Sequence, residues 1–451
     1  MLKLTPDQVF PTLKKHMLVD GFNNMVIDLQ KSQGHYVYDS LHDRRYLDLF
    51  SFFATAPVGH NHPRMADPEF KEKLLSVAIM KPSNSDFYTV EMAEFVETFS
   101  EYAVPDYLPY LFLISGGALG VENALKAAFD WKVRKNFAKG YKQEKGSQVI
   151  HFKEAFHGRT GYTLSLTNTA DPRKYKHYPK FDWPRVTNPK MTFPQNEENL
   201  RKVEALEAQA VREIKEAIQR NPDDIAAMII EPVQGEGGDN HFRKEFLLQL
   251  RQLADENEIM LVFDEVQTGI GLTGAMWCHQ NFGVQPDLLA FGKKTQVCGF
   301  LCSRRIDEVE NHVFQESSRI NSTWGGNLVD MVRFRKYLEI ITTENLINNA
   351  RKVGAYFIGE LQKLQDEFAA LITNVRGLGL MIAFDLPSGD TRAQFLSTAF
   401  ENGLIALGCG QRSVRFRPSL NLPRELVDEA IQIVRQSLRQ VSDKTSSSRA
   451  A

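Results

Sequence analysis

Short apolar runs alternate with helical patterns through the middle of the chain. The runs lie at residues 110–115, 148–152, 226–230, 259–263, 287–291 and 297–302. Most are apolar on both faces, as in a parallel sheet that helices cover on both sides. Between them, an apolar stripe at helical spacing from Leu200 to Ala217 has charged residues opposite it, and a second helix is expected to open at Ala118. This order predicts an α/β architecture.

The pattern changes after Gly326. Helices are predicted over residues 329–341, 348–367 and 424–438, with strand-like alternation at 375–386 and 414–418. These elements predict a smaller α+β domain, and residues 34–50 have the strand-and-turn character of a segment that could pack with it. The predicted division is an N-terminal segment packing with the small domain (1–60), a large domain (61–325), and a small domain that includes the interdomain helix (326–451).

Composition and charge narrow the class of protein. The chain has 451 residues, 43% hydrophobic and 24% charged, which is ordinary for a soluble globular protein. A net charge of −2 argues against a bulk basic field that would bind nucleic acid. No stretch approaches the ~18 consecutive apolar residues of a membrane span, and no signal peptide is indicated. The expectation is a soluble protein of the cytoplasm, either an enzyme or a binding protein.

Two further patterns could indicate binding sites. The four cysteines lack paired spacing, so neither a disulfide framework nor a structural zinc site is predicted, and a reducing cytosol fits best. A basic cluster with interleaved tyrosines, between Arg173 and Arg185, resembles a nucleic-acid patch. Because no RNA-binding module surrounds it, we interpret it as a solvated loop.

Polar residues follow three apolar runs at the points where strands should end. Asp264 follows one run, Gly292-Lys293-Lys294 follows the next, and Gly116-Gly117-Ala118 follows a third. Ligands of open α/β sheets bind at the carboxyl ends of the strands. Each feature alone is ordinary: a turn-forming acid, a surface lysine, a tight turn. Neither a GxGxxG nor a GxxxxGK[ST] motif is present.

Together, these residues match the needs of pyridoxal 5'-phosphate. That cofactor requires a lysine for covalent attachment, a carboxylate that keeps its ring nitrogen protonated, and donors for its phosphate. Lys293 follows its apolar run at the right place, and Lys294 is the competing candidate.

Longer strings carry a resemblance to a known family. The chain resembles the class III, ω-amino-acid aminotransferases of pyridoxal-phosphate fold type I from about Gly34 to Pro418, through FDEVQTGIGLTG (263–274), NSTWGGN (321–327) and VRFRP (414–418). Finer strings resemble the branch acting on the ε-amino group of lysine: KPSNSDFY (81–88), SGGALGVENALKAAFDWK (115–132), AFHGRTGYTLSLTNT (155–169), EPVQGEGGD (231–239) and FGKKTQVCG (291–299). The implied fold is a large domain with a mostly parallel seven-stranded sheet plus a smaller α+β domain.

The resemblance also implies a role for each matching residue at the cofactor. Lys293 would bind the cofactor covalently and move protons, and Asp264 would face its ring nitrogen. The remaining cofactor contacts are Gly117 and Ala118 at the phosphate, Phe156 on the ring face, Gln267 at the phenolic oxygen, and Thr323 at the phosphate of a neighbouring subunit. Thr323 thus implies a homodimer with shared active sites. No metal is expected.

The substrate residues follow the same way. Arg159 resembles the residue that grips the carboxylate of lysine and later the distal carboxylate of 2-oxoglutarate. Arg415 resembles the arginine for the carboxylate next to the reacting carbon. Because an unpaired buried charge is costly, Glu236 would pair with Arg415 until that carboxylate arrives. Asn321 and Gln267 are expected to contact substrate as well.

The expected reaction moves the ε-amino group of L-lysine to 2-oxoglutarate in two ping-pong half-reactions. Its products would be L-glutamate and 2-aminoadipate 6-semialdehyde, which cyclises to the piperideine carboxylate. Three alternatives stay open: the same chemistry on ornithine, 4-aminobutyrate or another ω-amine; an aminomutase or racemase; and a catalytically silent binding protein.

Overall fold

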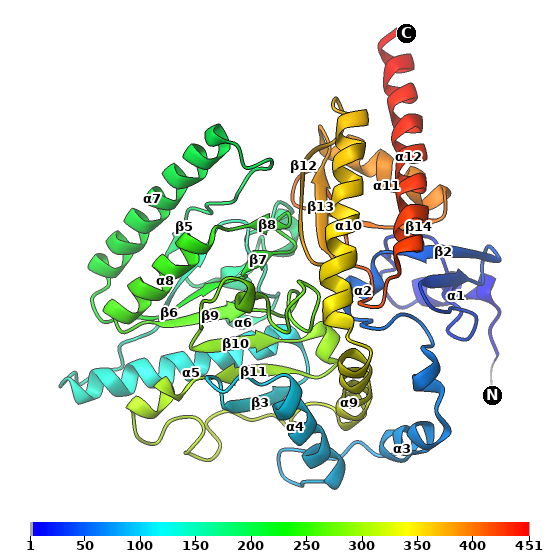
Figure 1. Cartoon of the computed structure of the whole chain (residues 1–451). Coiled ribbons are helices and arrows are strands. Elements are labelled where there is room, and N and C mark those ends of the chain that lie inside the picture. Colours follow the sequence, from blue (N-terminus) through cyan, green and yellow to red (C-terminus); the bar gives the residue numbers. More distant parts are fainter. Residues whose placement is uncertain (1–2, 451) are drawn as a thin grey trace.

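A seven-stranded sheet forms the centre of the larger part of the molecule (Figure 1). The computed structural model describes residues 3–450, with side chains over residues 3–443. The strand order is β3 (Tyr110–Ile114), β11 (Cys298–Cys302), β10 (Leu288–Phe291), β9 (Met260–Asp264), β6 (Ile225–Ile230), β4 (Gln148–Phe152) and β5 (Arg185–Val186). Strand β11 runs antiparallel to both of its neighbours, and the other described strands of this sheet all run in the same direction. The predicted mostly parallel sheet is confirmed.

Helices cover both faces of this sheet, which explains why its strands are apolar on both sides. Helix α5 (Gly117–Ala138) packs on one face, where Trp131 and Val262 share a hydrophobic cluster. Helices α7 (Glu197–Arg220) and α8 (Lys244–Glu256) cover the other face, where Ile214 and Phe263 share a second cluster. Helix α4 (Val90–Tyr102) packs against α9 (Leu328–Thr343).

The C-terminal part consists of helices packed against a second, antiparallel sheet. Helix α10 (Leu346–Glu367) lies beside α12 (Arg424–Ala450) and packs against a four-stranded antiparallel sheet (Figure 1). The order in this sheet is β12 (Thr373–Leu378), β13 (Met381–Asp385), β16 (Ser413–Phe416) and β15 (Leu407–Cys409). After helix α11 (Gly389–Glu401), strand β14 (Leu404–Ile405) pairs with β2 (Arg44–Asp48), which pairs with β1 (Tyr36–Asp39). The N-terminal and C-terminal segments therefore share a sheet.

The remaining α-helices and β-strands are shorter. They are α1 (Pro6–Lys14), α2 (Ser51–Ala54), α3 (Pro68–Ala78), α6 (Gly161–Leu166), β7 (Val233–Gln234) and β8 (Asn240–His241). Within residues 3–450, no helix combines the length and the apolar composition needed to cross a membrane.

The sheet brings the ends of β9 and β10 together. Ala290 of β10 is the register partner of Asp264 in β9, so the chain after each strand leaves the sheet at the same edge. Helix α5 begins at the same edge. Its first residue, Gly117, lies close to Val266, which follows β9: a Cβ atom added to Gly117 would lie 2.9 Å from Cγ1 of Val266. The acid, the lysine and the helix N-terminus that the sequence singled out are therefore neighbours.

Candidate active site

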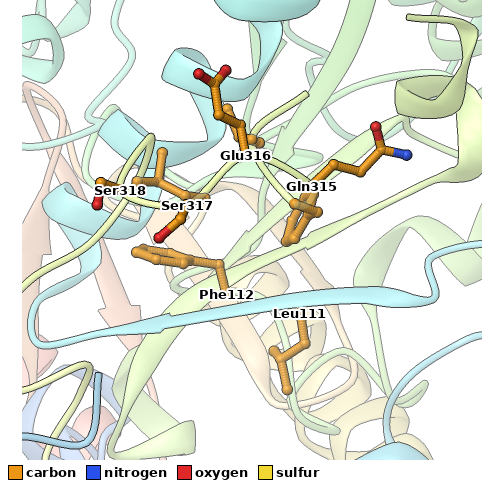
Figure 2. Close-up of a pocket in the computed structure, with 9 residues that line it drawn as sticks. Leu111, Phe112, Gln315, Glu316, Ser317 and Ser318 are labelled. Atoms are coloured by element: carbon orange, nitrogen blue, oxygen red, sulfur yellow. The ribbon is translucent and has the colours of Figure 1, made fainter. Parts of the chain in front are cut away.

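A cavity of about 1420 Å³ opens at this edge of the large sheet. It gathers predicted site residues from distant parts of the chain, namely Phe156, Arg159, Glu236, Gln267, Lys293 and Arg415. The second cavity, of about 340 Å³, lies between β3 and residues 313–320, and it contains none of the predicted site residues (Figure 2). The larger cavity is therefore the candidate active site.

Lys293 faces the large cavity. Its backbone is left-handed, with φ 55°, a conformation that is costly for a lysine and is often kept at functional sites. Burial lowers the pKa of its ammonium, and Arg415 lowers it further, whereas Asp264 and Glu231 raise it. The neighbouring Lys294 is only 1% exposed and does not line the cavity. The geometry favours Lys293 as the reactive amine.

Asp264 is held in one orientation by two donors. Nδ1 of His157 lies 2.8 Å from Oδ2 of Asp264, and the backbone N–H of Val266 donates to Oδ1 at 3.1 Å. The side chains of His157 and Asp264 are buried together. His157 was not identified from the sequence, although it lies beside Phe156 in the AFHGRTG string. It fixes the carboxylate that the sequence did identify.

Glu231 is a second residue that the sequence reasoning missed. It follows β6 and accepts the backbone N–H groups of Phe156 and Gly235, each at 2.9 Å. Complete burial raises the pKa of Glu231 to about 7. Through its two hydrogen bonds, Glu231 connects the loop that carries Phe156 to the loop that carries Gly235 and Glu236.

The N-terminus of α5 forms a narrow backbone cradle. Its N-cap, Gly116, has φ 112°, and no side chain caps the first turn. A Cβ atom on Gly292 would lie 3.5 Å from Cα of Gly117 and 3.0 Å from Sγ of Cys298. Uncapped N–H groups at a helix N-terminus suit an anion such as phosphate, and Ala118 is in the same turn. With the amine, carboxylate and aromatic ring nearby, these residues fit pyridoxal 5'-phosphate.

Arg415 and Glu236 form an ion pair in the cavity. Nη2 of Arg415 donates to Oε2 of Glu236 at 2.6 Å, so the predicted contact is present. Nη1 also lies 3.4 Å from the amide oxygen of Gln267, and the Phe53 ring centroid lies 5.7 Å from the guanidinium carbon. Although burial raises the pKa of Glu236, Arg415 and Lys174 outweigh it and hold that pKa below its usual value.

The interpretation of residues 173–185 as a solvated loop is wrong for Lys174. Its ammonium donates to Oε1 of Glu236, and its side chain lines the cavity. The sequence could not reveal this contact, because the two residues are 62 positions apart and meet only through the fold.

Three other predicted residues are exposed. Arg159 lines the cavity, and no carboxylate of the described part of the chain lies within ion-pair distance of it. Asn321 and Thr323 lie outside the cavity lining, in the segment before α9. The single chain therefore does not bring Asn321 and Thr323 to the other site residues.

Comparisons with known proteins agree with this geometry. The family model described as aminotransferase class-III matches residues 19–438. L-lysine-epsilon aminotransferase of Streptomyces clavuligerus is 47% identical over 98% of this chain and 96% of its own. A solved structure of lysine aminotransferase from M. tuberculosis is 49% identical with a TM-score of 0.95, covering 97% of this chain and 100% of that one. Human mitochondrial 4-aminobutyrate aminotransferase is more distant, 30% identical over 87% of this chain and 80% of its own.

Proposed function

The chain belongs to the class III aminotransferases, which use pyridoxal 5'-phosphate, and we propose that it transfers the ε-amino group of L-lysine to 2-oxoglutarate. The products are L-glutamate and 2-aminoadipate 6-semialdehyde, which cyclises to the piperideine carboxylate. The greater similarity to lysine-epsilon aminotransferases than to a 4-aminobutyrate aminotransferase supports lysine as the donor.

The residues around the cofactor divide the work. When bound, pyridoxal phosphate supplies an aldehyde that takes up the amine and a ring that withdraws electrons. Asp264, oriented by His157, stabilises positive charge on the ring nitrogen. Lys293, whose pKa burial lowers, gives up its own proton more readily than an ordinary lysine and can take a proton from one carbon and return it to another.

The charge arrangement of the cavity carries the substrate proposal. Arg159 is free to bind a carboxylate at a distance from Lys293, whereas Arg415 is already paired with Glu236. Lysine, which has no carboxylate near its ε-amine, leaves that pair intact. 2-Oxoglutarate has a carboxylate beside its reacting carbon, so it takes Arg415 and displaces Glu236. One cavity can therefore accept both substrates in turn.

We also propose that the enzyme is a homodimer with shared active sites. The exposed Thr323 would then reach the partner's cofactor phosphate, and Asn321 the substrate. Beside them, Ser83 donates to the Thr323 carbonyl at 2.6 Å. Apolar side chains exposed in the single chain nearby are Ile79, Met80, Phe87, Tyr88, Val90 and Trp324. Such a concentration of exposed apolar side chains supports a covering partner.

The proposed location is the cytoplasm. Its support is that Cys278, Cys298, Cys302 and Cys409 are all buried, unpaired thiols, as expected of a protein in a reducing compartment.

Lysine labelled with ¹⁵N at the ε-position tests the function. Incubation of the holoenzyme with labelled lysine and 2-oxoglutarate should place the label in glutamate. Initial rates with ornithine and 4-aminobutyrate should be lower than with lysine. A faster initial rate with ornithine or 4-aminobutyrate than with lysine would contradict the proposal that lysine is the amino donor. An isomerised product without consumption of the oxo-acid acceptor would indicate an aminomutase or racemase instead.

Gly117→Ala should weaken binding of the cofactor. The added Cβ would lie 2.9 Å from Cγ1 of Val266, so the first turn of α5 or the Val266 side chain must shift, which disturbs the phosphate cradle. We expect this steric clash to reduce the free energy of cofactor binding by about 1.4 kcal/mol, which raises the cofactor dissociation constant about tenfold. The matched control is Gly359→Ala, which meets nothing within 4 Å in helix α10. Equal cofactor affinity of both variants and wild type would count against the cradle.

A further inference from the structure

Lys174 forms a second ion pair with Glu236, and it does so at a separate oxygen. Its ammonium donates to Oε1, whereas Arg415 donates to Oε2 at 2.6 Å. The Lys174 side chain is only 16% exposed. Its nitrogen lies 5.9 Å from the ring centroid of Phe156. Glu236 can therefore lose its contact with Arg415 and still keep one with Lys174.

The backbone holds Lys174 in this place. Lys174 ends the 3₁₀ helix Pro172–Lys174, whose N-cap is Asp171. The Asp171 carboxylate accepts the backbone N–H of Arg173 at 3.1 Å, and the Arg173 side chain binds the same carboxylate at 2.8 Å. The lysine thus belongs to a fixed turn at the rim of the cavity.

We infer that Lys174 is a positioning residue that sets specificity for substrates with a carboxylate beside the reacting carbon. It holds Glu236 when that residue leaves Arg415, and this lowers the free-energy cost of releasing Arg415. The inference rests on the proposed function, because it concerns the 2-oxoglutarate half of the reaction.

The charges explain why Lys174 favours the state in which Glu236 has left Arg415. While Arg415 and Lys174 share one carboxylate, their mutual repulsion offsets part of the attraction of each for Glu236. Once a substrate carboxylate neutralises Arg415, that repulsion is compensated, and Lys174 keeps Glu236 paired. Without Lys174, the departing Glu236 would be a largely buried carboxylate without a cation, which is costly. Lys174 therefore stabilises the released state more than the paired state.

The opposite hypothesis predicts the opposite sign. If Lys174 instead clamped Glu236 onto Arg415, its removal would ease the release of Arg415 and tighten the binding of dicarboxylates. Two unreactive ligands separate the hypotheses. Glutarate carries a carboxylate for Arg159 and another for Arg415, whereas pentanoate carries only one, for Arg159.

The test compares both ligands by titration calorimetry on the holoenzyme. Lys174→Gln should raise the dissociation constant of glutarate about tenfold and change that of pentanoate less than twofold. Lys174→Arg, which keeps the cation, should restore glutarate binding. Lys176→Gln removes the same charge from an exposed position two residues away and should leave both constants unchanged. In turnover, Lys174→Gln should raise the KM for the oxo-acid acceptor about tenfold, with kcat and the KM for lysine within about twofold.

Three results would overturn the inference. One is glutarate binding in Lys174→Gln that is unchanged or tighter than in the wild type. Another is glutarate binding in Lys176→Gln that is weakened as much as in Lys174→Gln, which would indicate an effect of the total charge alone. The third is failure of Lys174→Arg to restore binding. If the wild-type enzyme does not transfer nitrogen from lysine to 2-oxoglutarate, the proposed function fails, and the inference fails with it.

Discussion

Lys293→Ala should lower kcat with lysine by at least about 10³-fold. The variant lacks both the amine that attaches the cofactor and the group that moves the proton, and proton transfer alone is worth about 10² to 10⁴. Single-turnover rates, with the cofactor content measured separately, check the result.

Lys294→Met is the matched control for this variant. Lys294 is more buried than Lys293, with only 1% of its surface exposed, and burial lowers the pKa of Lys294 well below its usual value. Methionine is of similar length and brings no charge into the interior, so folding and turnover should stay within about threefold of wild type. Loss of activity in Lys294→Met with retention in Lys293→Ala would exchange the roles of the two lysines.

Asp264→Asn should lower kcat by about 10² to 10³-fold. A neutral amide cannot stabilise positive charge on the ring nitrogen, so electron withdrawal by the ring is lost. The amide is nearly the same size as the carboxylate, and His157 and Val266 can still contact it. The rate of the lysine half-reaction at saturating cofactor is the measurement.

Glu231→Gln makes the same chemical change close by. Burial already raises the pKa of Glu231 to about 7, so a neutral side chain is tolerated there. One of its two backbone hydrogen bonds would be lost, because the amide nitrogen of glutamine cannot accept from a backbone N–H, and we expect at most about a tenfold loss of kcat. If Asp264→Asn loses no more than Glu231→Gln, the assigned role of Asp264 is wrong.

Much of the fold is visible in the sequence because the large sheet is buried on both faces. Continuous apolar runs marked six of its strands, including β6 and β9, within a residue or two. β5, with only Arg185 and Val186, is too short to leave a pattern. The antiparallel direction of β11 also depends on how strands meet in space, which a local pattern does not record. The domain division at residues 60 and 325 stays a prediction.

The site was predictable where chemistry coincides with a strand end. Asp264 ends β9 and Lys293 lies two residues after β10, and their convergence at one edge follows from parallel pairing. The same rule applied to β6 would have found Glu231. His157 and Lys174 were not predicted, because each matters through a contact with a distant residue. His157 contacts Asp264, 107 positions away, and Lys174 contacts Glu236, 62 positions away. Only tertiary structure turns such residues from ordinary polar positions into parts of a site.

Reduction of the wild-type holoenzyme with borohydride, followed by peptide mass mapping, tests the central claim most directly. The claim is that Lys293, which lies two residues after β10, carries the cofactor in the cavity that Arg159 and Arg415 also line. The pyridoxyl mass should be found on Lys293. Its appearance on Lys294, on another side chain, or on none would contradict the account.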